Sequence, residues 1–110
     1  MSDANSFEIR SNRKVVIRAL EHASVPQATG SLVSDCDGKT SYCGTGLMMI
    51  ALGIDPYSAD SETRLERALG LSVTDRRHLI KLNDAPVYLS FKGIARHLRK
   101  FTQDGIWPKV

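Results

Sequence analysis

Residues 42–53 have the sequence YCGTGLMMIALG and contain the only long uncharged apolar run in the chain, at positions 47–52. A glycine-rich turn precedes this run, and Gly53 follows it. Because threonine often caps a helix and glycine often ends one, the stretch predicts a buried helix over residues 45–53 with Thr45 as its N-cap. The rest of the chain can then pack around this central helix.

Four further helices are predicted by apolar residues that recur at helical spacing. They cover residues 13–23, 61–69, 73–83 and 91–101. Asn12 and Ser90 are typical N-caps for the first and the last of these helices. The last helix has the clearest apolar face, which is formed by Phe91, Ile94, Ala95, Leu98 and Phe101.

Two local signals separate the middle pair of helices. Gly70-Leu71 is typical of a glycine stop followed by its hydrophobic contact. Ser72-Val73-Thr74-Asp75 matches a capping box, which opens the helix over residues 73–83. We expect Asp60 or Ser61 to cap the helix that precedes this turn.

The segment before the central helix contains turn-forming residues rather than helical periodicity. Asp37-Gly38 is a dipeptide typical of tight β-hairpins, and it lies between two short segments, residues 31–34 and 39–42. We therefore expect a short β-hairpin over residues 31–42 that leads directly into the central helix. An irregular loop is the alternative.

Together these elements predict a mainly α fold with a minor β part. We expect a compact bundle of about five helices around the apolar helix at 45–53, with the hairpin before it. The 110 residues have the usual size of one domain, so we treat 1–110 as a single domain. Residues 1–10 and 102–110 are expected to be peripheral tails.

The sequence also indicates where the protein works. No apolar run approaches the roughly 20 residues that cross a bilayer, and the N-terminal sequence MSDANSFEIRSNRK lacks the apolar core of a signal peptide. We therefore expect a cytoplasmic protein, in a bacterial host cell, without membrane association. The two cysteines are then expected to be free thiols rather than a disulfide.

The net charge of +3 conceals an uneven distribution along the chain. Residues 1–53 carry five basic and five acidic side chains, and residues 54–75 carry two basic and five acidic ones. Residues 76–110 carry eight Lys and Arg against two Asp and Glu. A basic C-terminal part of this kind is typical of a surface that meets nucleic acid or an acidic partner, or of a merely solvated face.

The segment around the turn Leu69-Gly70-Leu71-Ser72 resembles a bacterial helix-turn-helix. In that arrangement helix 73–83 enters the major groove of DNA and presents Arg76, Arg77, His78 and Lys81. Glu66 and Arg76 depart from the pattern, because they place charge where the two helices of the motif pack. A DNA-binding regulator built from helices 61–69 and 73–83 is therefore the alternative function.

Cys43 precedes the central helix and is a candidate nucleophile, because a helix dipole stabilises a thiolate at its start. Its candidate bases are His22, His78 and His97, and the candidate orienting groups are Asn83 and Asp84. No spacing selects one of the histidines, and 110 residues are few for such an enzyme. We predict a non-enzymatic protein without catalytic residues; a thiol-dependent enzyme using Cys43 is the third possibility.

Metal and phosphate sites have weaker support. Cys36 and Cys43 are seven residues apart, which is not the short spacing of a zinc knuckle, and a site completed by His78 and His97 has no other support. We therefore predict no metal and no cofactor. Gly44-Thr45-Gly46 lacks the lysine and the spacing of a P-loop, although a helix start with two glycines can hold an anion.

Several short motifs follow one another in a characteristic order: Tyr42-Cys43-Gly44-Thr45-Gly46-Leu47, Leu69-Gly70-Leu71, Leu82-Asn83-Asp84 and Ser90-Phe91-Lys92-Gly93-Ile94-Ala95. Over residues 30–100 this order resembles a loose group of small proteins from bacteriophages and actinobacterial genomes. They share a Tyr-Cys-x-x-Gly helix start, an Asn-Asp step and a Ser-Phe-x-x-Ile-Ala tail. Gly44-Thr45-Gly46 replaces the more usual Cys-Leu-Gly of that group. The resemblance implies an accessory protein of a phage or mobile element rather than a particular activity.

We therefore expect a small binding protein that occupies or inhibits a host macromolecule through its basic C-terminal face. The contact residues that we predict are Arg76, Arg77, Lys81, Lys92, Arg96, Arg99 and Lys100. A host protein with an acidic surface is the partner that best complements this charge, and DNA is the alternative partner. The sequence predicts no oligomeric state.

Overall fold

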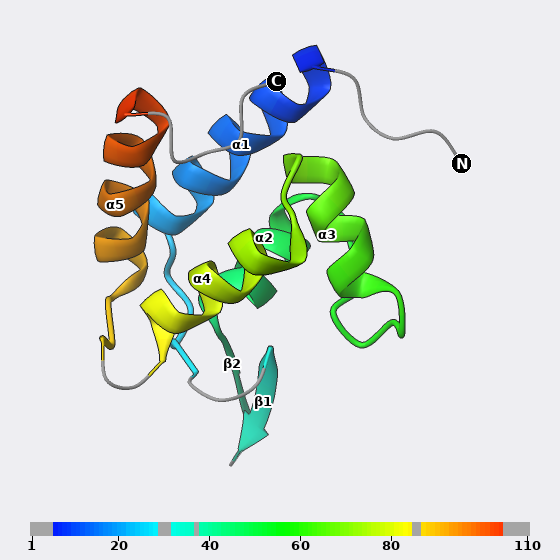
Figure 1. Cartoon of the computed structure of the whole chain (residues 1–110). Helices are drawn as coiled ribbons and strands as arrows, with labels where there is room; N and C mark the ends of the chain where they lie inside the picture. The colour runs from blue at the N-terminus through cyan, green and yellow to red at the C-terminus, as the bar shows by residue number, and fades with distance from the viewer. Residues whose placement is uncertain (1–5, 29–31, 37, 85–86, 105–110) are drawn as a thin grey trace.

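Five helices and one β-hairpin make up the part of the chain that the structure describes, residues 6–28, 32–36, 38–84 and 87–104; side chains at positions 6, 36 and 100–104 lie outside this description. The order in this computed structural model is α1 (Ser6–Glu21), β1 (Val33–Cys36), β2 (Lys39–Tyr42), α2 (Gly44–Ala51), α3 (Ser61–Leu69), α4 (Val73–Asn83) and α5 (Phe91–Asp104) (Figure 1). The predicted mainly helical fold with a hairpin is confirmed. Among the described residues, no helix is long and apolar enough to span a membrane.

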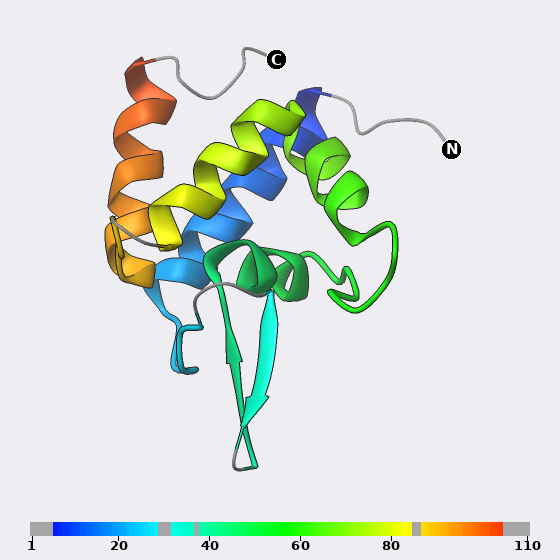
Figure 2. The same cartoon turned by 60° about the horizontal axis from the view of Figure 1, so that its bottom comes forward.

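Helix α2 is buried over residues 44–49, so the apolar run is only partly buried, because Ile50 within it is 46% exposed. It packs against α1, α3 and α4 and continues from the end of strand β2. Met48 and Met49 are fully buried within it, and Leu47 joins them in the core. In Figure 2, α2 lies at the side of the helical part from which the hairpin projects, and the hairpin points away from the helices in both views (Figures 1 and 2).

The N-cap of α2 is Cys43 and not Thr45 as predicted. Cys43 has extended backbone angles, and its Sγ accepts a hydrogen bond from the Gly46 amide at 3.3 Å. Thr45 lies inside the first turn and is fully buried, with its Oγ1 at 3.2 Å from Sγ of Cys43. The helix ends at Ala51, before Gly53, whose positive φ of 73° suits a glycine stop.

Two glycines allow the start of α2 to be buried. A Cβ atom on Gly46 would lie 2.1 Å from the carbonyl oxygen of Leu32, a backbone atom that cannot move independently. A Cβ atom on Gly44 would lie 3.0 Å from Cδ1 of Ile94, the end of a flexible side chain. Cys43 also donates its amide to the Leu32 carbonyl at 3.0 Å. The hairpin and α2 are therefore in backbone contact at this point.

Asn83, at the end of α4, connects three separate segments through its side chain, which is 1% exposed. Its Oδ1 accepts hydrogen bonds from the Gly44 amide at 2.9 Å and from Nε2 of Gln27 at 2.7 Å. Its Nδ2 donates to the Ala28 carbonyl at 2.8 Å and to Oδ1 of Asp84 at 2.9 Å. A side-chain amide has two donor hydrogens and two acceptor lone pairs, so this one is fully used.

Helix α1 starts at Ser6 rather than after Asn12, which is therefore not its N-cap. Ile9 is buried and lies two helical turns before Val16, so it extends the apolar face of this helix toward the N-terminus. Residues 6–10 consequently belong to the helix and not to a peripheral tail. The helix also ends at Glu21, slightly earlier than predicted.

The polar residues of α1 that face inward satisfy the end of α3. The side-chain amide of Asn12 donates to the Ala68 carbonyl, and Nε of Arg13 donates to the Leu69 carbonyl, each at 2.9 Å. The last carbonyls of a helix lack partners within it, so these two bonds replace the missing ones. Because Arg13 is buried, its desolvation lowers the pKa of the guanidinium from the usual value.

The three C-terminal helices keep the predicted starts. Gly70 ends α3 in the left-handed conformation with φ of 65°, and Ser72 and Asp75 form both bonds of a capping box before α4. Oγ of Ser90 accepts a hydrogen bond from the Gly93 amide at the start of α5. Four of the apolar residues predicted for α5 are buried: Phe91, Ile94, Ala95 and Leu98. The side chain of Phe101 is outside the described residues.

The β-hairpin is also confirmed. Strands β1 and β2 are antiparallel, with Val33 opposite Tyr42 and Cys36 opposite Lys39. Gly38 has a φ of 73°, which glycine adopts without steric cost in a tight turn. Residue 31, at the edge of the predicted hairpin, lies outside the described residues.

We expect Asn83→Ala to lower the free energy of unfolding by about 3 kcal/mol, because the buried Gly44 amide and Ala28 carbonyl lose their partner together. Asn12→Ala removes a single bond, to Ala68, and is expected to cost about 1 kcal/mol. Urea denaturation followed by circular dichroism measures both values. Equal losses for the two variants would contradict the central position of Asn83.

Gly46→Ala and Gly44→Ala form a second matched pair, since both sites lie in the first turn of α2. Gly46→Ala forces backbone apart and is expected to cost more than about 3 kcal/mol, whereas Gly44→Ala needs only a shift of the Ile94 side chain and is expected to cost about 1–2 kcal/mol. Thermal unfolding of the two proteins checks the order. A Gly46→Ala protein as stable as Gly44→Ala contradicts the close approach of Leu32 to α2.

Candidate functional site

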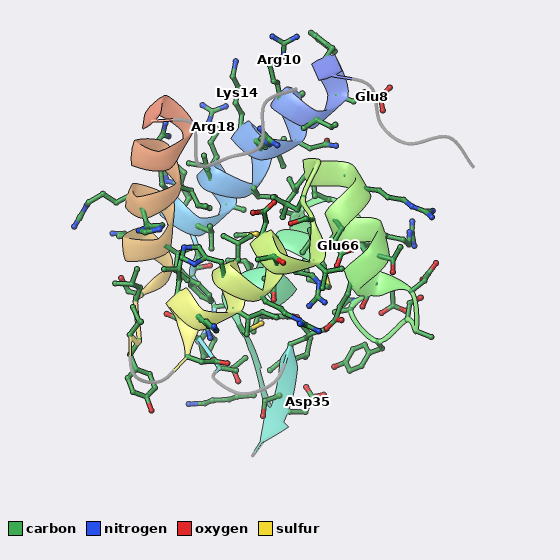
Figure 3. All side chains as sticks on the ribbon, in the orientation of Figure 1. Glu8, Arg10, Lys14, Arg18, Asp35 and Glu66 are labelled. Carbon is green, nitrogen blue, oxygen red and sulfur yellow. The ribbon has the colours of Figure 1, made fainter. Side chains whose placement is uncertain are left out.

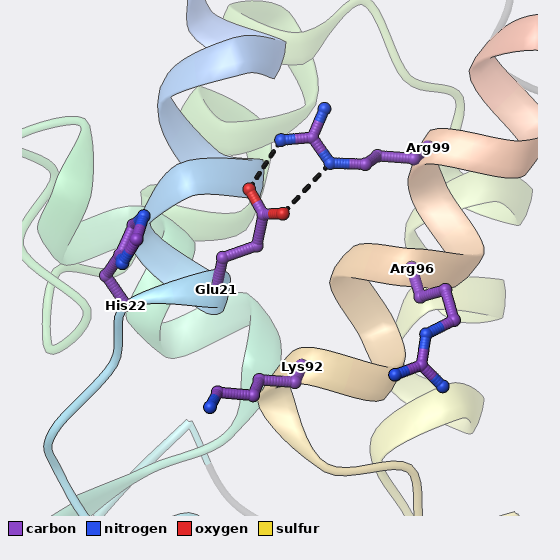
Figure 4. Close-up of a pocket in the computed structure, with 5 residues that line it drawn as sticks. All are labelled: Glu21, His22, Lys92, Arg96 and Arg99. Atoms are coloured by element: carbon purple, nitrogen blue, oxygen red, sulfur yellow. Dashed lines mark hydrogen bonds and ion pairs between the residues drawn. The ribbon is translucent and has the colours of Figure 1, made fainter.

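Basic residues surround an open hollow where α1 and α5 pack side by side. The hollow has a volume of about 480 Å³ and is lined by Glu21, His22, Lys92, Arg96 and Arg99 (Figure 4). A smaller hollow of about 250 Å³ is lined by Lys14, Ile17, Arg18 and Arg99. Arg99 lines both hollows, so they lie next to each other. We call their five cations, Lys14, Arg18, Lys92, Arg96 and Arg99, the α1/α5 basic surface.

The amphipathic sequences of the two helices create this surface. Lys14 and Arg18 are four residues apart on α1, and Lys92 and Arg96 have the same separation on α5, so each pair lies along one side of its helix. The opposite sides carry the core residues Val16 and Leu20 on α1 and Ile94 and Leu98 on α5, while Ile17 and Ala95 are buried between the two sides. Burial of the apolar sides therefore places the cations outward. Figure 3 shows Lys14 and Arg18 projecting from the outer side of α1.

Glu21 and Arg99 join the two helices across the hollow. Nε of Arg99 donates to Oε2 of Glu21 at 3.0 Å, and Nη2 donates to Oε1, so the carboxylate is held by two parallel bonds (Figure 4). The hydrogen bond from Arg99 holds the pKa of Glu21 below its usual range, and the same bond raises the pKa of Arg99. Glu21 is thus ionised at neutral pH, and it is the only acid among the described residues that line the two hollows.

The other cations of the surface form no ion pair with an acid of the described residues, although the charge of Arg18 also helps to lower the pKa of Glu21. Within the described part of the chain, no ion pair involves Lys14, Arg18, Lys92 or Arg96. Lys92 and Arg96 lie on successive turns of α5 and are exposed. Their positive charge is therefore available to a partner.

The structure brings together three of the seven predicted contact residues, Lys92, Arg96 and Arg99. Arg77 and Lys81 are exposed on α4, but neither lines the hollows. The side chain of Lys100 lies outside the described residues. The remaining residue, Arg76, lies in the interface between α3 and α4.

Arg76 is buried rather than part of an exposed face, since only 9% of its surface is exposed. Its Nε lies 2.6 Å from Oε1 of Glu66, and its Nη1 lies 3.3 Å from Oε2 of Glu62. Both acids belong to α3, so Arg76 ties α4 to α3. The two charged residues that depart from the helix-turn-helix pattern, Glu66 and Arg76, therefore compensate each other, and Arg76 is not available to a partner.

Sequence reasoning missed Lys14 and Arg18. The first 53 residues have no net charge, so counting charges by segment conceals the basic row on α1. The spacing of Lys14 and Arg18 was the available signal, because residues four apart on a helix share a face. Recognising it also required the pairing of α1 with α5, which no local pattern predicts.

Cys43 is buried and its thiol takes part in the cap of α2. The Gly46 amide donates to its Sγ, and the Gly44 amide donates to Oδ1 of Asn83. The helix start at Gly44-Thr45-Gly46 was a candidate anion site. The amides of Gly44 and Gly46 that would bind the anion already have acceptors within the protein. In the described residues no histidine is hydrogen-bonded to Cys43.

His78 of α4 and His97 of α5 lie together, with ring centroids 5.8 Å apart. They do not form part of a larger metal site in the described residues, which contain no group of three or more His, Cys, Asp or Glu placed to hold a metal ion. The side chain of Cys36 is outside this description. Two histidines on neighbouring helices can instead pack as part of the seam between α4 and α5.

Comparison of the chain with models of protein families, with curated protein sequences and with solved structures found no match.

Adjacent arginines on α4 provide a test of the buried ion pair. We expect Arg76→Ala to lower the free energy of unfolding by about 2–4 kcal/mol, because Glu66 keeps its charge in a partly buried place without its partner. Arg77→Ala changes an exposed side chain and is expected to stay within about 0.5 kcal/mol of the unmodified protein. Chemical denaturation of both variants measures the difference, and equal values would contradict the assignment.

Proposed function

We propose that this is a small non-enzymatic binding protein that occupies an acidic surface of a host protein through the α1/α5 basic surface. The observation that carries the proposal is the set of five cations that line two adjacent hollows sharing Arg99, with Glu21 as the single acid among the described residues that line them. Four of these cations make no ion pair within the described residues. Such unbalanced charge attracts a partner of opposite potential and orients it before contact.

The packing of α1 on α5 gives this surface a defined shape. The two helices lie against each other through core residues such as Ile17 and Ile94, so the backbones that carry the cations are rigidly placed. A rigid charged surface loses less conformational entropy on binding than a flexible tail of the same charge. This supports a specific contact rather than a merely solvated face.

The remaining candidate chemistry supports binding rather than catalysis. Cys43 uses its sulfur to cap α2 and is surrounded by the core, which is the environment of a structural cysteine. The resemblance to small phage and actinobacterial proteins supports the same proposal, because small accessory proteins of phages commonly act by occupying a host protein as inhibitors or adaptors. An acidic host surface is the complement that the charge of α1 and α5 favours.

DNA binding through α3 and α4 is the second candidate function. It is favoured by the three-residue turn between these helices and by the exposure of Arg77 and Lys81 on α4. A helix-turn-helix places its second helix in the major groove, where such side chains contact phosphates and base edges. The two candidates use different faces of the protein, so charge reversal separates them.

The test compares two double variants with the same change in charge. Lys92→Glu with Arg96→Glu alters the α1/α5 basic surface, and Arg77→Glu with Lys81→Glu alters α4. In affinity purification from host cells, we expect the first variant to capture its protein partner at least about tenfold less than the unmodified protein, since like charges then meet across the interface. The α4 variant is expected to capture it normally.

A mobility-shift assay with duplex DNA at low salt gives the complementary result. Binding that is lost in the α4 variant and kept in the α5 variant would establish the second candidate in place of the first. Normal capture of the host protein by the Lys92→Glu, Arg96→Glu variant would reject the α1/α5 basic surface as the contact. Thermal unfolding of both variants shows that they remain folded.

A further inference from the structure

We infer that Glu21 occupies, in the free protein, the place on Arg99 that a carboxylate of the partner takes in the complex. The partner contact is then an acidic segment of a protein chain, which inserts its carboxylates into the hollow between α1 and α5. This inference rests on the proposed function and names the chemistry of its partner.

The geometry of the Glu21–Arg99 pair is the first reason. The guanidinium of Arg99 presents two N–H groups to the two carboxylate oxygens of Glu21, one bond to each oxygen. This parallel arrangement matches the planar fork of arginine to the planar carboxylate. The hollow thus already contains one carboxylate held by the guanidinium of Arg99 in this arrangement.

The weakness of this pair is the second reason. The side chains of Arg99 and Glu21 remain 55% and 32% exposed, so water screens their attraction. The apolar sides of α1 and α5 pack independently of it, through residues such as Leu20 and Leu98. A competing carboxylate can therefore displace Glu21 while the two helices stay in contact.

The surroundings of the pair favour a partner carboxylate over Glu21 alone. Lys92 and Arg96 line the same hollow as Arg99, and neither pairs with an acid in the described residues. A segment with several acidic side chains can contact these cations together, whereas Glu21 pairs with Arg99 only. Binding of such a segment adds ion pairs that the free protein does not have.

The shape of the site distinguishes a protein segment from duplex DNA. The cations surround an open hollow of about 480 Å³ between two helices (Figure 4). Recognition of duplex DNA usually inserts a helix of the protein into the major groove, which requires a protruding element. A concave basic site instead receives a protruding acidic chain, in the way that arginine clusters recognise acidic motifs.

Glu21→Gln tests the inference, because it keeps the shape of the side chain and removes its charge. A fluorescently labelled oligoglutamate peptide is titrated with the protein at low salt, and its anisotropy is measured. We expect Glu21→Gln to bind the peptide roughly threefold to tenfold more tightly, since Arg99 is released and one repulsive charge is removed.

Glu62→Gln is the matched control. It also removes a carboxylate that pairs with an arginine, Arg76, but it lies on α3 and lines neither hollow. The peptide affinity of this variant is expected to equal that of the unmodified protein. The same gain in both variants would mean that net charge alone acts, and the inference would be wrong.

Arg99→Lys examines the fork itself, because it keeps the charge and removes the parallel N–H groups. We expect this variant to bind the peptide more weakly than the unmodified protein. Affinity equal to that of the unmodified protein would overturn the place given to Arg99. A labelled DNA duplex is titrated in parallel. If Glu21→Gln raises the affinity for DNA by as much as the affinity for the peptide, or by more, the choice of a carboxylate partner is wrong.

Failure of this inference is distinguishable from failure of the proposed function. If the Lys92→Glu, Arg96→Glu variant loses its host partner while Glu21→Gln leaves peptide binding unchanged, the basic surface stands and the role of Glu21 is rejected. If no variant binds the peptide, the inference is also wrong, because it depends on carboxylates binding to this surface.

Discussion

The buried side chain of Asn83 is the interaction on which the rest of the structure depends. It holds the first amide of α2 and the carbonyl of Ala28, and it does so from the last turn of α4. Segments distant in the sequence thereby meet at a single polar point inside an apolar core. Because every donor and acceptor of the amide is used, alternative placements of α2 leave buried polar groups unpaired. This polar contact specifies one arrangement where hydrophobic burial alone would allow several.

The arrangement around α2 leads directly to the candidate surface. With α2 fixed against Asn83 and the hairpin, α1 contacts it along one side and carries α5 on its own flank. The apolar sides of α1 and α5 then face inward, and their cations line two hollows that share Arg99. The surface is thus a consequence of core packing, and Glu21 and Arg99 join the two helices through a pair that stays partly exposed to water.

The sequence predicted the elements whose boundaries depend on neighbouring residues. Gly70 with Leu71, the capping box at Ser72 and the turn at Gly38 act locally, and the structure has all three. The sequence did not predict the true start of α1. The buried Arg13 interrupts the apolar pattern of this helix, because its guanidinium donates to a carbonyl of α3. The basic row on α1 was missed for a similar reason. Pairings between distant segments, which decide both features, leave no signal in a local pattern.

The cations of this chain show why charge counting located the site only in part. Arg76 is buried and held by two acids of α3, so it contributes to stability and not to the surface potential available to a partner. Arg99 is exposed but already holds Glu21. Lys92 and Arg96 are exposed and make no ion pair with any described residue. Only positive charge of this last kind is fully available for binding. The excess of basic residues after position 75 therefore overstates the attraction of that segment, and the neutral total before position 54 conceals the contribution of Lys14 and Arg18.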